Sequence, residues 1–303
     1  MRKERLSNYG LNLINNSTNK IKQTPELPSL PAIVIATGSR CSGKTQFMAD
    51  LIRKYRQGGS FDIVKIISPT FESNEALYDT IVEDTDEDVY KNGSVQDFKD
   101  FLQFVADEAD EFNEFKKKIK LYKELQKQLR NSNLKIEDIN PSLLEIFYDH
   151  ETGEFKKPEP KYKDENGNSR RPSIGLFLDD CMSSELMKGN NRMFQNAMIK
   201  HRHWKNVGYS VFLAVQAFKS SAGGISKAVR SNMTTLVCFK THSKKELESI
   251  MEEVSGDVNP EQLMEAYEYA TEAPHSALVI DMKPRKEHPS GLRRNLDEFL
   301  IFD

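Results

Sequence analysis

The sequence predicts an α/β fold with a mostly parallel central sheet. Six short apolar segments have the composition of buried strands, and segments with helical periodicity alternate with them. The strands are expected at residues 32–36, 61–67, 173–178, 209–215, 234–239 and 276–281. The first two enclose one helix, and such a strand–helix–strand unit requires a right-handed crossover and therefore a parallel pair.

The chain begins with a polar segment, residues 1–31, that ends in three prolines. Prolines at this spacing disfavour helix, so we expect an extended N-terminal arm. After the first strand and a glycine-bearing loop, residues 45–56 have helical spacing that stops at Gly58-Gly59. The second strand ends at Ser68-Pro69-Thr70, which is a turn sequence.

The segment at about 83–172 differs in composition, and we interpret it as a helical and loop-rich insertion. It opens with the acidic run 83–88. Between 95 and 129 apolar residues recur every three or four positions, which indicates one amphipathic helix or a helix pair. A hairpin turn is expected at 148–155. Residues 156–171 are rich in lysine, proline and asparagine, so we expect them to be mobile.

The core resumes with the strand at 173–178, which leads into Asp179-Asp180. Further helices are expected at 191–203, 226–232 (a short helix or turn), 243–254 and 260–270. Ser243, with Glu246 three places on, has the sequence of a capping box. The core therefore spans residues 32–282, and 283–303 are predicted to form a basic C-terminal tail.

One motif between the first strand and its helix points to phosphate binding. Its sequence is Gly38-Ser39-Arg40-Cys41-Ser42-Gly43-Lys44-Thr45, which matches G-x-x-x-x-G-K-[ST] in the structural context that the motif demands. Backbone N–H groups of such a loop face the phosphates, and the positive end of the following helix adds to them. We expect Lys44 to reach the β- and γ-phosphates of ATP and the Thr45 hydroxyl to bind Mg²⁺.

Two further strands end in polar side chains that suit the same chemistry. In P-loop enzymes a carboxylate on the neighbouring strand holds the Mg²⁺ shell, so Asp179 is the candidate metal residue. Asp180 is the candidate general base that orients or deprotonates water. Gln216 ends the following strand in the equivalent position and is a candidate sensor of the γ-phosphate.

Cations gather in several places. An arginine from a neighbouring subunit stabilises the transition state in ring ATPases, and Arg202 and then Arg230 are the candidates for that role. The stretches 156–171 and 283–294 are also basic and could touch a phosphate backbone. For each of these stretches alone, a solvated face is the favoured interpretation.

Composition excludes several classes of protein. The chain has 303 residues and a net charge of -3, with 29% charged residues against an ordinary value of about 25%. No run approaches the ~20 apolar residues of a membrane span, and the first residues lead into no apolar stretch, so no secretory signal is expected. Three cysteines, Cys41, Cys181 and Cys238, have neither disulfide-framework nor metal-ligand spacing. An intracellular, reducing setting fits best.

The ordered set of motifs resembles the FtsK/HerA superfamily of P-loop motor ATPases, and within it the genome-packaging ATPases of large double-stranded DNA viruses, virophages and Polinton-like elements. The residues that carry the likeness are Gly38–Thr45, Ser68–Thr70, Phe177–Cys181, Arg202-His203, Gln216 and Val229–Asn232. The likeness covers roughly 31–72 and 173–282. Where the superfamily often has Asp-Glu, this chain has Asp179-Asp180.

The resemblance implies a P-loop NTPase fold of the RecA/ASCE-like kind and a homo-pentameric or homo-hexameric ring. Such a ring would use ATP and Mg²⁺ to pull double-stranded DNA into a capsid, in contact with capsid or portal vertex components. It implies a location in the host cell cytoplasm or viral factory, and transiently at the virion vertex. A DNA helicase or translocase outside packaging and a small-molecule kinase stay open as alternatives. No Asn-Lys-x-Asp motif is present, which argues against a GTPase.

Overall fold

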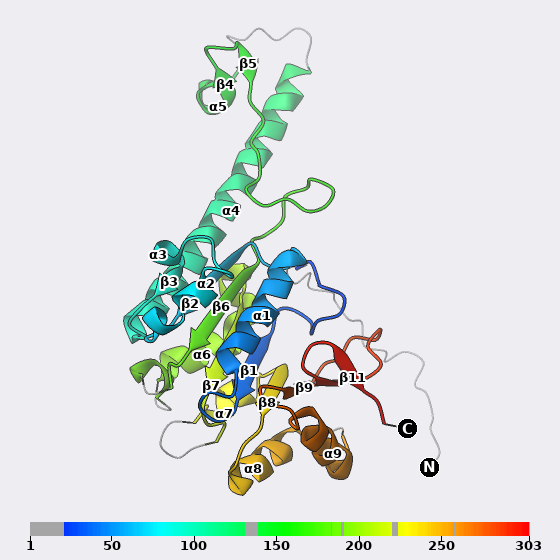
Figure 1. Ribbon diagram of the computed structural model, residues 1–303. Helices are drawn as coiled ribbons and strands as arrows, with labels where there is room; N and C mark the ends of the chain where they lie inside the picture. The colour runs from blue at the N-terminus through cyan, green and yellow to red at the C-terminus, as the bar shows by residue number, and fades with distance from the viewer. Residues whose placement is uncertain are drawn as a thin grey trace, which may run out of the picture.

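A nine-stranded sheet runs through the molecule (Figure 1). The computed structural model describes residues 21–130, 139–182, 184–188, 191–219, 224–256 and 258–302. The strands of this sheet are β1 (Ile33–Thr37), β2 (Ile63–Ile67), β3 (Val89–Tyr90), β6 (Ile174–Asp179), β7 (Ser210–Val215), β8 (Thr235–Phe239), β9 (Ala277–Asp281), β10 (Leu292–Arg294) and β11 (Glu298–Leu300). Their order is β11-β10-β9-β8-β1-β7-β6-β2-β3.

The strands from β8 to β3 in this order are parallel, which confirms the predicted α/β class with a mostly parallel sheet. All six predicted strands are present. The last one, β9, is antiparallel to β8. Two helices of equal length, α8 (Lys244–Val254) and α9 (Pro260–Ala270), connect these strands. Because there are two of them, the chain returns to the carboxyl end of β8 before β9 begins.

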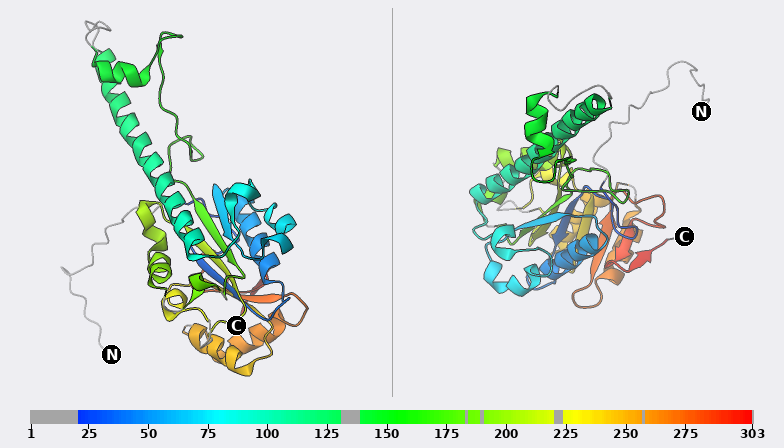
Figure 2. Two further views of the ribbon diagram at one scale, coloured as in Figure 1. Left: turned by 90° about the vertical axis from the view of Figure 1, so that its left-hand side faces the viewer. Right: turned by 90° about the horizontal axis from the view of Figure 1, so that it is seen from above.

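Helices cover both faces of the sheet (Figure 2). One face packs against α1 (Lys44–Gln57) and α2 (Glu75–Tyr78). The short helix α3 (Thr85–Asp88) contacts β2 through Asp88, which accepts from Lys65 at 2.7 Å. The other packs against α6 (Arg192–Lys200), α7 (Lys227–Arg230), α8, α9 and the first half of α4 (Val95–Leu129). Side chains alternate between the two faces along each buried strand, so that Val34 and Ala36 face α1 while Ile33 and Ile35 face the second layer.

The predicted amphipathic region forms one helix, α4, of 35 residues and therefore about 52 Å. A capping box between Ser94 and Asp97 opens it. Its first half packs on the sheet through residues such as Phe98 and Val105, and its second half leaves the body as an arm (Figure 1). At the tip lie α5 (Pro141–Phe147) and the predicted hairpin, β4 (Tyr148–Asp149) with β5 (Glu154–Phe155).

The return segment, residues 156–171, which we expected to be mobile, forms ion pairs with α4 and with the body of the molecule. Lys161 Nζ donates to Glu108 at 2.7 Å and to Glu111 at 2.8 Å. Arg170 forms a two-pronged ion pair with Asp62, at 2.5 and 2.6 Å. The polar composition that suggested mobility instead supplies partners for carboxylates of the body and of α4.

The C-terminal residues also depart from expectation, because 292–300 form β10 and β11 and extend the sheet beyond β9. Leu292 and Arg293 are buried there. Arg293 donates to the Glu26 carbonyl, and His288 lies 2.8 Å from the Pro25 carbonyl. Residues 21–31 of the predicted extended arm include a turn at 24–27, bury Leu27 and Leu30, and lie against this C-terminal unit. Residues 1–20 of the predicted arm lie outside the described residues.

Three smaller details complete the fold. The predicted helix at 191–203 ends as α6 at Lys200, and a 3-10 segment, His201–Asn206, follows it. Further 3-10 turns lie at Phe71–Ser73 and Glu185–Met187. Ser243 caps α8, but the Glu246 carboxylate accepts from the backbone N–H of Phe218, so only half of the predicted capping box forms. In the described part of the chain, every helix is too short or too polar to cross a membrane.

Candidate nucleotide-binding site

The predicted phosphate loop occupies residues 38–43, between the end of β1 and the start of α1. Gly43 precedes the helix with φ 101° and ψ 8°, a left-handed conformation that glycine adopts without strain. A Cβ on Gly38 would lie 2.6 Å from the Phe239 Cβ, so only glycine fits there. The first turn of α1 carries no acidic residue, which leaves the positive end of the helix free to attract an anion.

Lys44 folds back over this loop. Its Nζ donates to the carbonyls of Gly38 at 2.9 Å and Ser39 at 2.7 Å. Burial lowers the pKa of the Lys44 ammonium, while the nearby Asp179 and Asp180 carboxylates act against that shift. A phosphate oxygen is a stronger partner for the ammonium than a neutral carbonyl, so an incoming phosphate would compete for it.

Thr45 and Asp179 meet directly, although they are 134 residues apart in the sequence. The Thr45 hydroxyl donates to Asp179 Oδ1 at 3.0 Å. Mg²⁺ prefers hard oxygen ligands and takes one or two from the protein, with water and phosphate oxygens completing its shell. A hydroxyl and a carboxylate beside a phosphate loop fit that requirement, so Thr45 and Asp179 would hold Mg²⁺ there.

The Asp179 carboxylate is buried and accepts a second hydrogen bond, from the Tyr78 hydroxyl at 2.7 Å. Tyr78 also lies 2.9 Å from Ser68 Oγ, which follows β2 at the same edge of the sheet. Burial raises the pKa of Asp179, and the bonds from Tyr78 and Thr45 oppose that rise. Tyr78 was not predicted from the sequence, because nothing in the spacing of α2 relates it to the end of β6.

The strand that carries Asp179 is not the immediate neighbour of β1, contrary to the prediction. β7 lies between them, with Ala214 in register with both Ala36 of β1 and Asp179 of β6. The methyl side chains of Ala214 and Ala36 lie on the face that α1 covers. Because these two positions are small, the contact between Thr45 and Asp179 can bridge the intervening strand.

Asp180 and Gln216 follow β6 and β7 at the edge where the phosphate loop lies. Asp180 adopts a left-handed backbone with φ 51°, and Gln216 Nε2 donates to its Oδ1 at 3.2 Å. The structure therefore brings these two predicted residues together. The pair could orient a water molecule, since a carboxylate accepts a proton and an amide fixes the direction of the carboxylate.

The two predicted arginines lie elsewhere. Arg202 belongs to the 3-10 segment that precedes β7, so it lies at the opposite end of that strand from Gln216, about 20 Å away along six residues. Arg230 forms an ion pair with Glu253 (Nε to Oε1, 3.4 Å) and packs over the Phe218 ring. In the described part of the chain, neither arginine forms a hydrogen bond or ion pair with the phosphate loop or with Asp179.

A cavity of about 790 Å³ opens beside the loop. One wall is made by loop and α1 residues from Cys41 to Phe47, with Asp50 and Lys54. The lining also includes His275 and the turn between β10 and β11, Asn295–Asp297. This turn was not expected near the site, because the sequence suggested a separate tail. The cavity is large enough to receive the sugar and base of a nucleotide.

Comparisons with known proteins found likenesses in structure only. No family model and no curated protein sequence matches the chain. Among solved structures, the genome packaging NTPase B204 from Sulfolobus turreted icosahedral virus 2, in complex with ATP-gammaS, is 10% identical. That match has a TM-score of 0.46 and covers 90% of this chain and 100% of that one.

B204 from Sulfolobus turreted icosahedral virus, described as a DNA-packaging ATPase, is 12% identical, with 83% and 93% of the two chains covered and a TM-score of 0.46. EssC (ATPases 2 and 3) from Geobacillus thermodenitrificans is 15% identical, with a TM-score of 0.46. The EssC match covers 92% of this chain and 43% of that one. The chain itself has an α/β fold whose mostly parallel sheet is flanked by helices and carries a phosphate loop at its carboxyl edge.

Proposed function

We propose that the protein is a Mg²⁺-dependent ATPase that moves double-stranded DNA, and that its task is to package a viral genome into a capsid as a homo-oligomeric ring of five or six subunits. The observation that carries the ATPase assignment is the Thr45–Asp179 hydrogen bond beside an intact phosphate loop. Two distant segments place there the two oxygens that Mg²⁺ requires in a nucleotide site.

Each predicted residue has a role in this proposal. The backbone N–H groups of residues 38–45 and the Lys44 ammonium hold the β- and γ-phosphates. Thr45 and Asp179 would hold Mg²⁺, which neutralises developing charge on the phosphates when bound. Asp180, oriented by Gln216, accepts a proton from the attacking water. Arg202 acts on the site of a neighbouring subunit, because the site of its own chain lies at the other end of the sheet.

The partners and location follow from the packaging role. Double-stranded DNA is the cargo, capsid or portal vertex components hold the ring, and the protein works in the host cell cytoplasm or viral factory and transiently at the virion vertex. A helicase or translocase outside packaging would share the ATPase site but need no capsid. A small-molecule kinase would release ADP only when its acceptor is present.

ATP hydrolysis by the Lys44→Ala variant tests the site. We expect turnover to fall at least ~100-fold, because the phosphate charge is no longer matched. Lys99→Ala removes an exposed lysine of α4 and should retain full activity. Duplex DNA at low salt should stimulate the wild-type protein. ATP hydrolysis that survives in Lys44→Ala would overturn the site assignment. If duplex DNA does not change the rate of hydrolysis by the wild-type protein, the protein is an ATPase but the proposed DNA motor function is contradicted.

A further inference from the structure

The charge of α4 reverses along its length. From Val95 to Phe115 the helix carries seven acidic residues and one lysine, Lys99. From Lys116 to Arg130 the chain carries six lysines and one arginine against a single acidic residue, Glu124. The last residue of α4 in the main hydrophobic core is Ala109, so the cations from Lys116 onward belong to the part of the helix that extends from the body (Figure 1). The ATPase fold does not account for a concentration of cations at this place.

Five of these seven cations lie on one side of the helix, at positions i, i+4, i+7, i+11 and i+14. We call them the basic stripe: Lys116, Lys120, Lys123, Lys127 and Arg130. At 100° per residue they fall within about 80° of arc and extend over about 21 Å. The same direction is occupied in the first half of α4 by apolar residues that pack on the sheet, Phe98, Leu102, Val105 and Ala109. The stripe thus continues the line of the core contact beyond the edge of the body.

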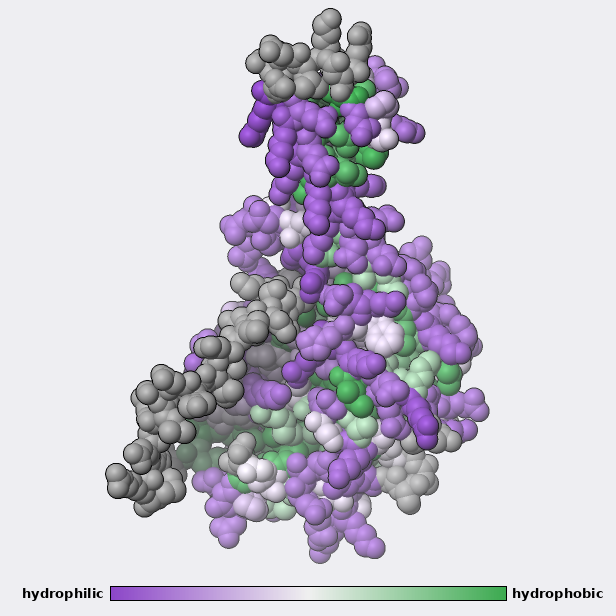
Figure 3. Space-filling model, turned by 180° about the vertical axis from the view of Figure 1, so that it is seen from behind, coloured by the Kyte–Doolittle hydropathy of each residue, from purple (hydrophilic) through white to green (hydrophobic). Residues whose placement is uncertain are grey.

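The opposite side of the distal helix is covered. Leu125 is buried there with Leu143 and Phe147 of α5, and Leu121 and Tyr122 pack against them. The five residues of the stripe are all exposed, and within the described part of the chain none of them forms an ion pair. Figure 3 shows the arm as largely hydrophilic, with hydrophobic residues gathered near its tip.

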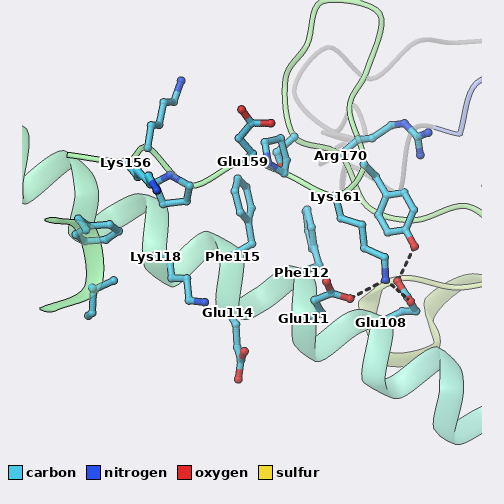
Figure 4. Close-up of a pocket in the computed structure, with 17 residues that line it drawn as sticks. Glu108, Glu111, Phe112, Glu114, Phe115, Lys118, Lys156, Glu159, Lys161 and Arg170 are labelled. Carbon is cyan, nitrogen blue, oxygen red and sulfur yellow. Dashed lines mark hydrogen bonds and ion pairs between the residues drawn. The ribbon is translucent and has the colours of Figure 1, made fainter. Parts of the chain in front are cut away.

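The base of the arm is fixed by charge. Figure 4 shows Lys161 of the return segment between Glu108 and Glu111 of α4, and Tyr162 donates to Glu108 at 2.8 Å. The cavity beside this contact, about 590 Å³, is lined by side chains of both signs, so it suits no simple polyanion. The contact of Lys161 and Tyr162 with Glu108 and Glu111 holds α4 against the return segment. It therefore fixes the direction in which the stripe faces.

Three ordinary explanations do not account for the stripe. Cations favour a helix C-terminus, but that effect falls off within the last turn, whereas Lys116 lies more than three turns before the end. The buried centre of a protein–protein interface is usually apolar, whereas the stripe contains no apolar residue and Leu121, Tyr122 and Leu125 of the distal helix pack toward α5. A single small anion requires converging donors, and these side chains are spread along a line.

The geometry points to the basic stripe of α4 as a contact surface for the phosphate backbone of duplex DNA. A straight row of cations matches an extended polyanion that carries one charge per ~1.7 Å of its axis, and such binding needs no base contacts. Lysine predominates in the stripe and is a point charge suited to contacts that slide. The choice of DNA as the polyanion rests on the proposed function. The position and exposure of the five cations do not depend on that proposal.

Binding of a fluorescent 30-base-pair duplex of random sequence to the full chain, followed by anisotropy over a range of salt concentrations, tests this surface. Lys120→Gln/Lys127→Gln removes two charges from the stripe, and Lys117→Gln/Lys118→Gln removes two from other faces of the same helix. We expect the stripe pair to weaken binding about 10-fold near 0.1 M salt and to reduce the slope of log K against log salt by about 2. The matched pair should change the slope by less than 1.

The outcomes separate this inference from the proposed function. Equal effects of the two pairs, or a wild-type protein that binds no duplex at low salt, would overturn the stripe as a DNA surface. Displacement of duplex by polyglutamate at the same charge concentration would also overturn it and indicate an acidic protein partner. Hydrolysis of ATP without DNA should be unchanged in both pairs. Absence of hydrolysis in the wild type would instead contradict the proposed function.

Discussion

The Asp179 carboxylate is buried between two hydroxyl donors, Tyr78 at 2.7 Å and Thr45 at 3.0 Å. Burial raises its pKa above the value in the unfolded chain. The folded protein therefore binds this proton more tightly, and the stability that the neutral form contributes is lost as pH rises through the folded pKa. The hydroxyl donors reduce this loss, because they stabilise the ionised form that a metal requires.

Tyr78→Phe should move the pH dependence of ATP hydrolysis. Loss of the hydroxyl removes a donor that lowers the pKa of Asp179, so that pKa rises further and the acid limb of the pH–rate profile shifts to higher pH. We expect turnover at neutral pH to fall about 10-fold. Tyr55→Phe removes an equally buried hydroxyl, which donates to the Pro28 carbonyl at 2.8 Å, and should leave the profile in place. The same shift in both variants would contradict a specific role for Tyr78.

At the scale of elements, the sequence predicts the helices, strands and loops that local composition determines. The buried parallel strands are continuous apolar runs, and the phosphate loop is a complete motif, so both could be located from the residues alone. The position of β7 between β1 and β6 could not, because strand order depends on packing between distant segments. β10 and β11 were also missed, since a three-residue strand such as Leu292-Arg293-Arg294 has no apolar run to reveal it.

Within the site, the meeting of Thr45 with Asp179 follows from strand ends that share an edge, and the contact of Asp180 with Gln216 follows in the same way. Tyr78 and the Asn295–Asp297 turn enter the site only through tertiary packing of α2 and the β10–β11 unit. No spacing rule connects those segments to the loop. The positive charge of residues 283–294 suggested an exposed tail. Arg293 of β10 is nevertheless buried.

Arg293 should be important for stability, because its guanidinium is 1% exposed and ties β10 to the Glu26 carbonyl and to His288. We expect Arg293→Gln to lower the free energy of unfolding by about 3 kcal/mol, since it removes these buried contacts and the cation that acts most strongly on the buried Asp281 carboxylate. Arg294→Gln, at a half-buried neighbour stacked on Tyr269, should cost less than about 1 kcal/mol. Urea denaturation of both variants measures the difference. Equal losses would mean that β10 is not anchored through Arg293.

At the scale of the whole molecule, the predicted catalytic groups are divided between the two ends of the sheet. The phosphate loop, Asp179, Asp180 and Gln216 lie at the carboxyl end of the parallel strands, and Arg202 precedes the start of β7. One chain therefore cannot bring Arg202 to its own site. Under the proposed ring, this residue would meet the nucleotide of the next subunit.

Mixtures of two inactive variants test that arrangement. Arg202→Ala should abolish hydrolysis while preserving nucleotide binding, because it leaves the loop intact. Mixed with Lys44→Ala, it should recover part of the activity, since some subunit boundaries then combine an intact loop with an intact arginine. His203→Ala, at an exposed neighbour, is the control and should stay active without mixing. Mixtures that remain inactive across all ratios would argue against a contribution from the neighbouring chain.

The central sheet ends on both sides in very short strands, the two residues of β3 and the three residues of β11. A long unpaired strand offers a row of free backbone groups to another chain, and short outer strands remove most of that row. Copies of this protein therefore have little opportunity to join by extending one sheet into the next. In the proposed ring, association would therefore depend on side chains of helices and loops, and it could be reversed without breaking backbone hydrogen bonds between strands.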